Sequence, residues 1–264
     1  MMNLKELPPE LASFCAASKI TAVQIGMSAA DVYKIARGDH CHYLKVISRA
    51  YDGTTFDLQR EQKMMQWLEH KLPVPKVLAY HETAEKNYLL MTAVPGQAAD
   101  AYTAQHDPYA LVDRMVEGLR QLWAVPIANC PFLNDRASRV RELEDLMRRG
   151  LADIATENWQ ANTGFSDPDE LLLHLQTTEF NEDLVLSHGD FGDSNFFVDQ
   201  DKISGWIDLG RCGLADKWYD IAFCVRALQD DFEDQVYLDY FFEKLGLDPD
   251  WEKINYFILL DEMF

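Results

Sequence analysis

The chain has 264 residues, 48% of them hydrophobic and 26% charged, which excludes wholesale disorder and allows a sizeable core in one large domain or two lobes. Its formal net charge of −20 argues against nucleic acid and anionic membrane as partners, because binding either relies on lysine and arginine. A cationic ligand fits this charge better. Alternatively, the charge serves only to keep the protein soluble.

Five scattered cysteines without a CxxC or Cys/His pattern fit a reducing compartment and argue against structural zinc. The N-terminal segment lacks the basic start and continuous apolar run of a signal peptide. No uncharged apolar stretch in the sequence is long enough to span a membrane. Together these features predict a cytoplasmic protein.

The first part of the chain is predicted to be rich in β-structure. Strands are expected at residues 20–25, 31–36 and 42–47, after Pro75, and around 88–91. Between the third and fourth strands, apolar residues and Glu61 recur at spacings of three and four, which predicts a helix over about 55–71. The sequence Val94-Pro95-Gly96 breaks the pattern and is the predicted hinge.

Beyond this break the pattern is mostly helical. Helices are expected at about residues 108–124, 138–149, 168–176, 216–229, 233–245 and 249–263. The exception is 184–208, where an apolar run at 184–187 precedes a hairpin that turns at 199–202. The predicted fold class is therefore α+β. A small antiparallel-sheet lobe with one main helix covers residues 1–94, and a larger, mostly helical lobe covers 95–264.

The strongest chemical signal is the sequence HGDFGDSN at residues 188–195. Asp190 and Asn195 bracket a polar loop before the hairpin, and Asp208 follows its far end. Since a hairpin returns its ends to one neighbourhood, Asn195 and Asp208 are expected to converge and to bind Mg²⁺ through hard oxygen atoms. Asp190 would then orient a hydroxyl and accept its proton, as phosphoryl transfer requires. His188 more often supports such a loop than reacts.

Lys45 and Glu61 form the second signal. Lys45 shares a strand face with Tyr43 and Ile47, and Glu61 lies inside the apolar stripe of the next helix. A buried carboxylate there requires a cationic partner, and Lys45 is the natural one. So paired, Lys45 would reach nucleotide phosphates. Alternatively, the two residues form an ordinary ion pair. Tyr43 would either stack on adenine or pack in the core.

These residues resemble the protein-kinase set of a strand lysine, a helix glutamate, an HxDxxxxN loop and a following Asp-x-Gly. HGD in place of HRD, the sequence IDLGRCGLADKWYDIAFCVR and the ending LLDEMF are similar to aminoglycoside 3'-phosphotransferases over nearly the whole chain. The resemblance implies a bilobal kinase-like fold with a nucleotide-binding N-terminal lobe and a catalytic, aminoglycoside-binding C-terminal lobe. It also implies ATP or GTP as donor, two Mg²⁺ ions, and phosphorylation of the 3'-hydroxyl, or of the 5'-hydroxyl in some drugs, which confers resistance.

The resemblance assigns roles to individual residues. Lys45 would contact the α- and β-phosphates, Glu61 would position it, Asp190 would be the catalytic carboxylate, and Asn195 and Asp208 would bind magnesium. Backbone groups near Thr92 and Val94 would hold the adenine, on which Tyr43 could stack. The Gly26-Met27-Ser28 turn, with the Ser28 hydroxyl, would cover the phosphates. The sequence of that turn departs from the GxGxxG pattern of protein kinases. Backbone N–H groups and the Ser28 hydroxyl must therefore bind the phosphates with fewer glycines. No APE segment follows Asp208, so we expect constitutive activity.

The acidic residues are unevenly distributed. Residues 153–190 hold nine Asp or Glu and no Lys or Arg, and residues 230–264 hold eleven acids and two lysines. These segments would form either the walls of a pocket for a polyamine or two solvated helix faces. By resemblance, the drug contacts are Asp153, Glu157, Gln160, Asp190, Arg211, Arg226, Asp230, Asp231, Glu262 and the carboxylate of Phe264. Gln160 stands where a glutamate is expected and loses one charge.

Some assignments have alternatives. Arg211 would either stabilise charge at the γ-phosphate or pair with a neighbouring acid. Asp220 is expected to cap its helix or support the catalytic loop. The main rival function is a kinase of the same fold that acts on another small cationic or sugar metabolite, and the second is an inactive module that sequesters cationic drugs.

Overall fold

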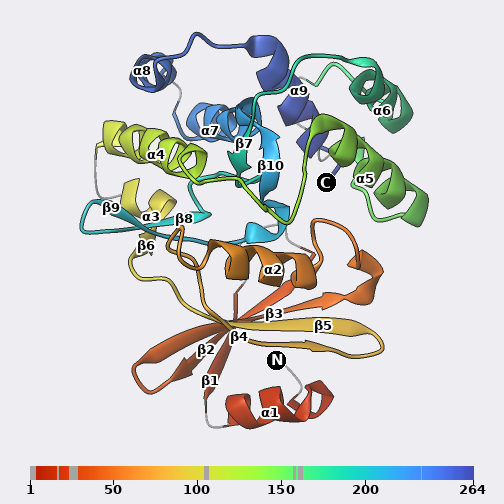
Figure 1. Ribbon diagram of the computed structural model, residues 1–264, viewed down its shortest axis with the longest axis vertical. Coiled ribbons are helices and arrows are strands. Elements are labelled where there is room, and N and C mark those ends of the chain that lie inside the picture. Colours follow the sequence, from red (N-terminus) through yellow and green to blue (C-terminus); the bar gives the residue numbers. More distant parts are fainter. Residues whose placement is uncertain are drawn as a thin grey trace. The chain divides into compact units, whose positions relative to one another are not determined.

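Contacts divide the chain into two compact units. Unit 1 comprises Met1–Gly96 and Ser204–Arg211, and unit 2 comprises Gln97–Ile203 and Cys212–Phe264 (Figure 1). The computed structural model describes residues 4–16, 18–23, 29–103, 107–156, 159, 163–232 and 234–264. The return segment that carries Asp208 groups with unit 1, although it lies beyond the predicted lobe boundary.

Unit 1 is built on a five-stranded antiparallel sheet with the strand order β1-β2-β3-β5-β4. Its strands are β1 (Lys19–Val23), β2 (Asp31–Arg37), β3 (His40–Ser48), β4 (Val77–Glu82) and β5 (Lys86–Thr92). All five were expected, and the last two predicted residues of β1 lie outside the described residues. In the central strand β3, Lys45 is paired with Val32 of β2 and Leu89 of β5, so its backbone is held from both sides.

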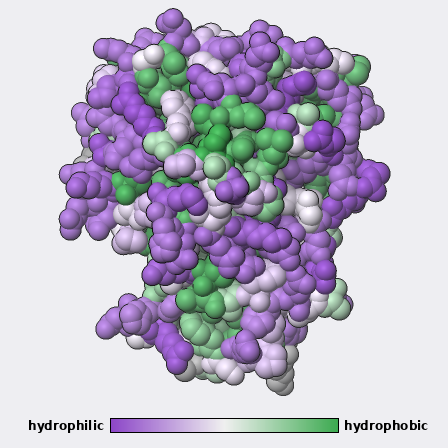
Figure 2. All heavy atoms as spheres, in the orientation of Figure 1, coloured by the Kyte–Doolittle hydropathy of each residue, from purple (hydrophilic) through white to green (hydrophobic). Residues whose placement is uncertain are grey.

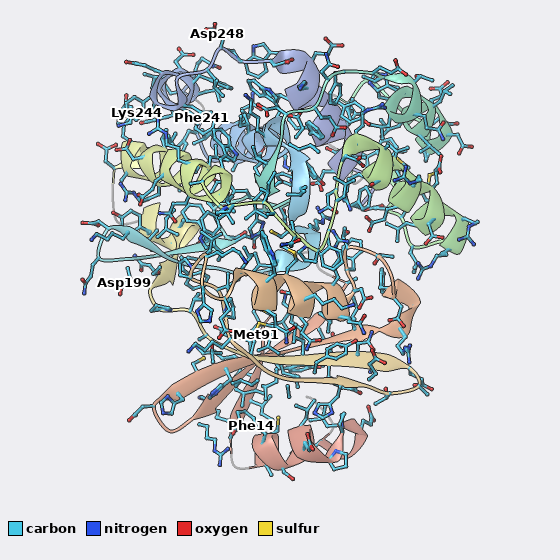
Figure 3. The ribbon with its side chains drawn as sticks, in the orientation of Figure 1. Phe14, Met91, Asp199, Phe241, Lys244 and Asp248 are labelled. Atoms are coloured by element: carbon cyan, nitrogen blue, oxygen red, sulfur yellow. The ribbon has the colours of Figure 1, made fainter. Side chains whose placement is uncertain are left out.

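The helix α1 (Pro9–Ala16) covers one face of this sheet (Figure 1). Leu44 and Val46 of β3 are buried in a core that also contains Leu11 of α1. Phe14 packs against the same core (Figure 3). This leaves the other face of β3 for Lys45. The sequence analysis missed α1, because eight residues are too few to display a clear helical period.

The helix α2 (Leu58–Leu68) packs on the opposite face of the sheet (Figure 1) and is shorter at both ends than predicted. Asp57 caps it: one carboxylate oxygen accepts from the Gln59 backbone N–H at 2.8 Å, and the other accepts from Gly53 N–H at 2.9 Å. Glu61 falls in the first turn, and its side chain is buried as its place in the apolar stripe predicted.

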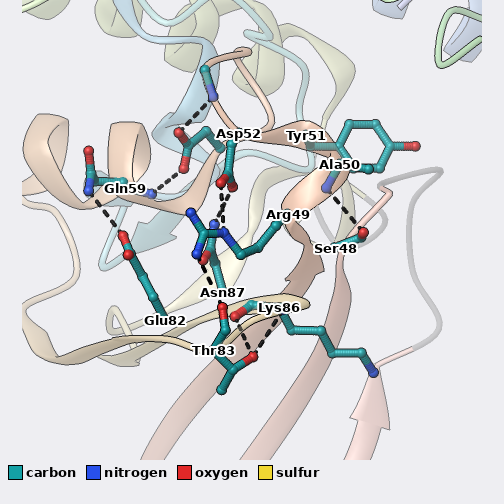
Figure 4. Close-up of polar contacts among 12 residues, drawn as sticks. Ser48, Arg49, Ala50, Tyr51, Asp52, Gln59, Glu82, Thr83, Lys86 and Asn87 are labelled. Carbon is teal, nitrogen blue, oxygen red and sulfur yellow. Dashed lines mark hydrogen bonds and ion pairs between the residues drawn. The ribbon is translucent and has the colours of Figure 1, made fainter. Parts of the chain in front are cut away.

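A polar network ties the start of α2 to the β4–β5 hairpin (Figure 4). Asp52 accepts from the Arg49 Nε at 2.8 Å and from the buried Asn87 Nδ2 at 2.7 Å. From α2, the Gln59 Nε2 donates to Glu82 on β4 at 3.2 Å. The first turn of α2 is therefore fixed relative to the sheet on which it lies.

Unit 2 is mostly helical, as predicted. Its helices are α3 (Ala99–Thr103), α4 (Pro108–Trp123), α5 (Arg136–Arg149), α6 (Pro168–Thr177), α7 (Lys217–Asp231), α8 (Val236–Leu245) and α9 (Trp251–Asp261). The sequence predicted all of them except α3, which has five residues. On α8, Phe241 is buried and Lys244 lies on the solvent side (Figure 3), so the helical period separates core from surface.

Short strands complete the structure and make the fold class α+β. β7 (Leu184–Ser187) pairs with β10 (Gly213–Asp216), and β6 (Gln97–Ala98) pairs with β8 (Phe196–Asp199), which continues into β9 (Lys202–Trp206). The sequence did not predict β6 or β10, because β6 has only two residues and β10, with the sequence GLAD, lacks the apolar run that marks β7.

The predicted hairpin between β8 and β9 is present. Gln200 and Asp201 have φ values of 49° and 60°, the left-handed conformation that a tight two-residue hairpin turn requires. The Tyr102 hydroxyl of α3 donates to the Asp201 carboxylate at 2.7 Å, and Arg114 of α4 donates to the Asp201 carbonyl at 2.6 Å. These contacts fix the turn within unit 2.

The surface is predominantly hydrophilic on the face shown in Figure 2, with apolar side chains gathered in limited areas. Among the described residues, no helix combines the length and the apolar run that crossing a bilayer requires.

Candidate active site

Lys45 is the centre of a polar cluster in unit 1. Its Nζ donates to the two carboxylate oxygens of Glu61 at 2.6 and 2.8 Å. The same nitrogen lies 2.6 Å from the Asp208 Oδ1. The side chain of Lys45 is 12% exposed and that of Glu61 is 4% exposed, so this pair is shielded from water. The ion pair that the position of Glu61 predicted is therefore present.

The two carboxylates also control the protonation of Lys45. Burial alone lowers the pKa of the ammonium, but the negative charges of Asp208 and Glu61 raise it more, and the resulting pKa lies above the ordinary value. Lys45 therefore stays charged at neutral pH. A fixed, shielded cation of this kind suits the binding of phosphate oxygens.

Asp208 has a left-handed backbone conformation, with φ of 59°, which is uncommon for residues other than glycine. The next turn, the 3-10 helix η4 (Leu209–Arg211), is held against α2. The Arg60 Nε donates to the Gly210 carbonyl at 2.8 Å, and the first N–H of η4 donates to the Glu61 carboxylate. Contacts with α2 thus set the direction of the Asp208 carboxylate.

Gly210 lies against the backbone of Thr55, and a Cβ built there would meet the Thr55 carbonyl oxygen at 2.6 Å. We therefore expect Gly210→Ala to displace η4 and to lower the free energy of unfolding by about 1–3 kcal/mol. Gly192→Ala is the matched control, because a Cβ at Gly192 meets only the Ser194 Oγ at 3.9 Å. Urea unfolding of both variants checks the prediction, and equal midpoints would contradict it.

The predicted adenine-binding residues lie near the end of β5. The Thr92 Oγ1 accepts from the Lys76 backbone N–H at 2.9 Å. Val94 packs over Gly205, where an added Cβ would lie 2.3 Å from the Val94 Cβ. Tyr43 is half-buried on the face of β3 that carries Lys45. The structure brings these residues into unit 1 together with the lysine.

The catalytic-loop sequence lies in unit 2 and begins where β7 ends. The Asn195 Nδ2 donates to the Asp190 Oδ2 at 3.0 Å and to the Asp190 carbonyl at 2.8 Å. Asn195 is 8% exposed. Since its amide nitrogen bonds to Asp190, its amide oxygen is the atom suited to a hard cation. The pattern D-x-x-x-x-N therefore produces a single hydrogen-bonded unit.

The Asp220 carboxylate of α7 forms hydrogen bonds with the backbone at the start of this loop. Its side chain is fully buried and accepts from the backbone N–H groups of His188 at 2.7 Å and Gly189 at 2.9 Å. Burial raises the pKa of Asp220, and His188 and the two N–H donors oppose that rise. The contacts agree with the supporting role that the sequence favoured for Asp220.

Acidic residues of the catalytic loop and of α7 also meet. Asp193 shares a hydrogen bond with Asp231, and burial followed by the charge of Asp231 raises the pKa of Asp193 to about 7. On the same helix, the Arg226 Nη2 lies 2.8 Å from the Asp261 carboxylate of α9, and Asp230 is exposed. Of the predicted drug contacts, Arg226 and Asp231 thus have acidic neighbours within unit 2.

The last residues of the chain are ordered. The Asp153 backbone N–H donates to the Met263 carbonyl at 3.2 Å, and this bond brings the predicted contact Asp153 next to the residue that precedes Phe264. Glu262 is half-buried at the end of α9. The Phe264 ring lies under the Arg139 guanidinium, with 3.8 Å between its centroid and the Arg139 Cζ.

Three predicted site residues, Ser28, Glu157 and Gln160, lie outside the described residues. Arg211 belongs to η4 in unit 1, and its guanidinium carbon lies 5.4 Å from the Phe56 ring centroid.

Sequence reasoning missed several residues that shape the site. Asp261, which pairs with Arg226, stands in the LLDEMF ending beside the predicted contact Glu262. Arg60 precedes Glu61 and resembles an ordinary solvated helix residue. Arg139 is likewise one of several arginines in α5. No sequence signal distinguishes the half-buried Arg60 or the buried Arg139 from the other charged residues of its helix.

The chain has clear relatives of known type. The model of the phosphotransferase enzyme family, APH, matches residues 19–257. An aminoglycoside 3'-phosphotransferase from Enterococcus faecalis is 45% identical over 264 residues, and one from Staphylococcus aureus is 44% identical over 264 residues, each match covering 100% of both chains.

Solved structures share the fold. That of an aminoglycoside-3'-phosphotransferase of type VIII has a TM-score of 0.78 and 26% identity, covering 94% of each chain. An aminoglycoside phosphotransferase from Streptomyces rimosus in complex with ADP and streptomycin has a TM-score of 0.76 and 23% identity, covering 99% of this chain and 98% of that one. The chain therefore belongs to the phosphotransferase enzyme family and, within it, to the aminoglycoside 3'-phosphotransferases.

Proposed function

We propose that this protein transfers the γ-phosphate of ATP to a hydroxyl group of an aminoglycoside antibiotic and so confers resistance. The target is the 3'-hydroxyl, or the 5'-hydroxyl in some drugs. The observation that carries the proposal is the buried Lys45 ammonium, which lies 2.6 Å from both Glu61 and Asp208. A charged lysine held extended in this way presents a fixed cation to the phosphates. The cytoplasm, which supplies ATP, is the proposed location.

Lys45 would bind the α- and β-phosphates, and Glu61 would hold it in place. The related Streptomyces rimosus enzyme was solved with ADP, which supports ATP as the donor over GTP. Backbone groups near Thr92 and Val94 would bind the adenine, beside Tyr43. The Ser28 hydroxyl would cover the phosphates.

Magnesium fits the donor set. Asn195 offers an amide oxygen and Asp208 a carboxylate, which are hard ligands suited to Mg²⁺. The described residues contain no cluster of three or more His, Cys, Asp or Glu that would hold a metal by protein ligands alone. Mg²⁺ usually keeps several waters and binds phosphate oxygens, so two protein ligands are compatible with its binding. When bound, two such ions would offset the negative charge of the triphosphate.

Asp190 would act at the acceptor. Its Oδ2 is held by the Asn195 amide at 3.0 Å, and the loop below is held by Asp220. A carboxylate so fixed can orient the acceptor hydroxyl and accept its proton as the oxygen attacks phosphorus. Transfer would be direct, with no phosphoenzyme. Arg211 would either stabilise charge at the γ-phosphate or serve the packing of η4 on Phe56.

Acidic residues of unit 2 would bind the ammonium groups of the drug. The proposed acidic contacts are Asp153, Glu157, Asp230, Asp231, Glu262 and the Phe264 carboxylate, and Gln160 and Arg226 are proposed as contacts to other polar groups of the drug. Each carboxylate can pair with one ammonium, and their summed field speeds the encounter of a polycation with the site.

A substrate panel tests the proposal. We expect ADP formation from ATP and Mg²⁺ with kanamycin, and none above background with its 3'-deoxy analogue tobramycin, because tobramycin lacks the target hydroxyl. Equal turnover of the two drugs would remove the 3'-hydroxyl assignment. No turnover of either would favour a kinase of another cationic or sugar metabolite, and drug binding without ADP formation would favour a sequestering module.

A further inference from the structure

Gly205 of β9 lies where the neighbouring chain leaves no room for a side chain. A Cβ built on it would lie 2.3 Å from the Val94 Cβ, and 2.6 and 2.7 Å from the two Val94 Cγ atoms. The backbone of Gly205 does not have a positive φ, so it is this close approach that requires glycine. Next to it, the Ser204 Oγ donates to the Pro95 carbonyl at 2.6 Å. Two consecutive residues of β9 therefore hold Val94 and Pro95 at short range.

The stretch 92–95 is also fixed at its other end. The Thr92 backbone N–H donates to the Lys76 carbonyl at 3.0 Å, and the Thr92 Oγ1 accepts from the Lys76 N–H at 2.9 Å. The Trp206 N–H of β9 donates to the Pro73 carbonyl at 2.9 Å. The short segment before β4 thus contacts both the start of the stretch and the end of β9, and these contacts together close a ring around residues 92–95.

Within this stretch, one backbone donor is left for a ligand. The N–H groups of Thr92 and Ala93 are used by carbonyls of the protein, that of Ala93 by Cys41 at 3.2 Å, and Pro95 has no N–H. Among the described residues, none accepts a hydrogen bond from the Val94 N–H. A backbone donor held by fixed neighbours is preorganised for an acceptor such as a ring nitrogen of a nucleobase.

The strand β9 also leads directly to the proposed magnesium ligand. Asp208 follows Trp206 by two positions, and its Oδ1 lies 2.6 Å from the Lys45 Nζ. Val94, Gly205 and Asp208 all belong to unit 1. The distance between the stretch that would bind the base and the groups that would bind the phosphates is therefore set through the end of β9.

We propose that Ser204 and Gly205 are positioning residues for the nucleotide. Gly205 admits Val94 to close range, and Ser204 holds the following carbonyl, so that the base-binding backbone lies at one distance from β9. This inference rests on the proposed function and adds two determinants of its nucleotide affinity. The competing explanation is that both contacts only stabilise unit 1.

Steady-state kinetics of the full-length enzyme separate the two explanations, because lost stability lowers the amount of active enzyme but not its KM. For Ser204→Ala we expect the KM for ATP to rise about fivefold, with kcat and the KM for kanamycin within about twofold of wild type. Ser204→Thr keeps the hydroxyl and should keep the wild-type KM for ATP. Ser18→Ala is the matched control, because it removes a hydroxyl bond to the Phe14 carbonyl at 3.1 Å elsewhere in unit 1.

Gly205→Ala should have the larger effect, because its methyl group must displace Val94. We expect the KM for ATP to rise at least tenfold. Adding Val94→Gly removes all three atoms that the new Cβ would meet, so the double variant should recover at least threefold of that loss. Val94→Gly alone should give no such gain. If Gly205→Ala does not fold, the Ser204 variants still test the proposal.

Three results would overturn the inference. They are an unchanged KM for ATP in folded Ser204→Ala, a loss confined to kcat in that variant, and an equal KM for Gly205→Ala with and without Val94→Gly. Titration with ATP in the absence of kanamycin keeps this test separate from the proposed function. If wild type gave no kanamycin-dependent ADP formation, the proposed function would fail, whereas a weaker ATP affinity of Ser204→Ala in the titration would still support the positioning role.

Discussion

Replacement of Asp190 with alanine is expected to lower kcat for kanamycin by about 10²–10⁴-fold, because the acceptor hydroxyl loses the group that orients it and accepts its proton. The affinity for ATP should change little, since Lys45 and Asp208 belong to unit 1 and do not depend on Asp190, and the other proposed magnesium ligand, Asn195, keeps a bond to the loop backbone. The Asn195 amide also keeps its bond to the carbonyl of residue 190 at 2.8 Å, so the loop should remain folded.

Two measurements check this result, coupled detection of ADP and a nucleotide titration. The matched control is Asp199→Ala, which removes an acid of equal charge at the exposed β8–β9 turn in the same unit (Figure 3). Its kcat should equal that of the wild type. If Asp190→Ala retained full turnover, the assignment of the catalytic carboxylate would be wrong.

The second large effect is expected at Asp220, which does not itself need to touch the substrate. Asp220→Ala leaves the buried His188 N–H without its Asp220 acceptor, leaves the Gly189 N–H with only its bond to the Ser187 Oγ, and opens a cavity next to the loop. We expect the free energy of unfolding to fall by about 3–5 kcal/mol. The turnover of the folded fraction should fall too, because the loop that carries Asp190 loses its support.

Denaturant unfolding and kcat measured on the same samples check this prediction. Gln229→Ala, at an exposed position of α7, is the control and should stay within about 0.5 kcal/mol of the wild type. The free energy of unfolding of Asp220→Asn should lie between those of Asp220→Ala and Gln229→Ala. The amide oxygen of the asparagine accepts one N–H bond, while its NH₂ group faces the second donor. A wild-type stability for Asp220→Ala would show that the loop is held by other contacts.

The clearest success of the sequence was the ion pair of Lys45 and Glu61. A carboxylate inside an apolar helical stripe must be buried, and a buried carboxylate needs a cation, so the partner followed from local pattern and desolvation cost. In the structure, the Lys45 Nζ lies 2.6 Å from the Glu61 Oε1. The long strands and helices were predictable for the same reason, since a period of two or of about 3.6 residues repeats often enough within them to be recognised.

Other features depend on contacts between residues far apart in the sequence. Arg60 is one of many charged helix residues until its Nε reaches the Gly210 carbonyl, 150 residues later. The left-handed conformation of Asp208 depends on the same docking of η4 on α2. Arg139 resembles the exposed Arg141 in sequence, and only the packing of the chain end on α5 buries one and not the other.

By itself, therefore, the sequence determined the α+β class and the main elements, and it predicted which residues react, because periodicity and short motifs are local properties of a chain. Only the tertiary structure decided between the two roles expected for Asp220, and only it placed Arg60 beside the Asp208 turn and Arg139 on Phe264. Such supports are hydrogen bonds and packing contacts across long sequence separations. These contacts stabilise the protein only after folding has brought the partners together, so no local sequence pattern predicts them.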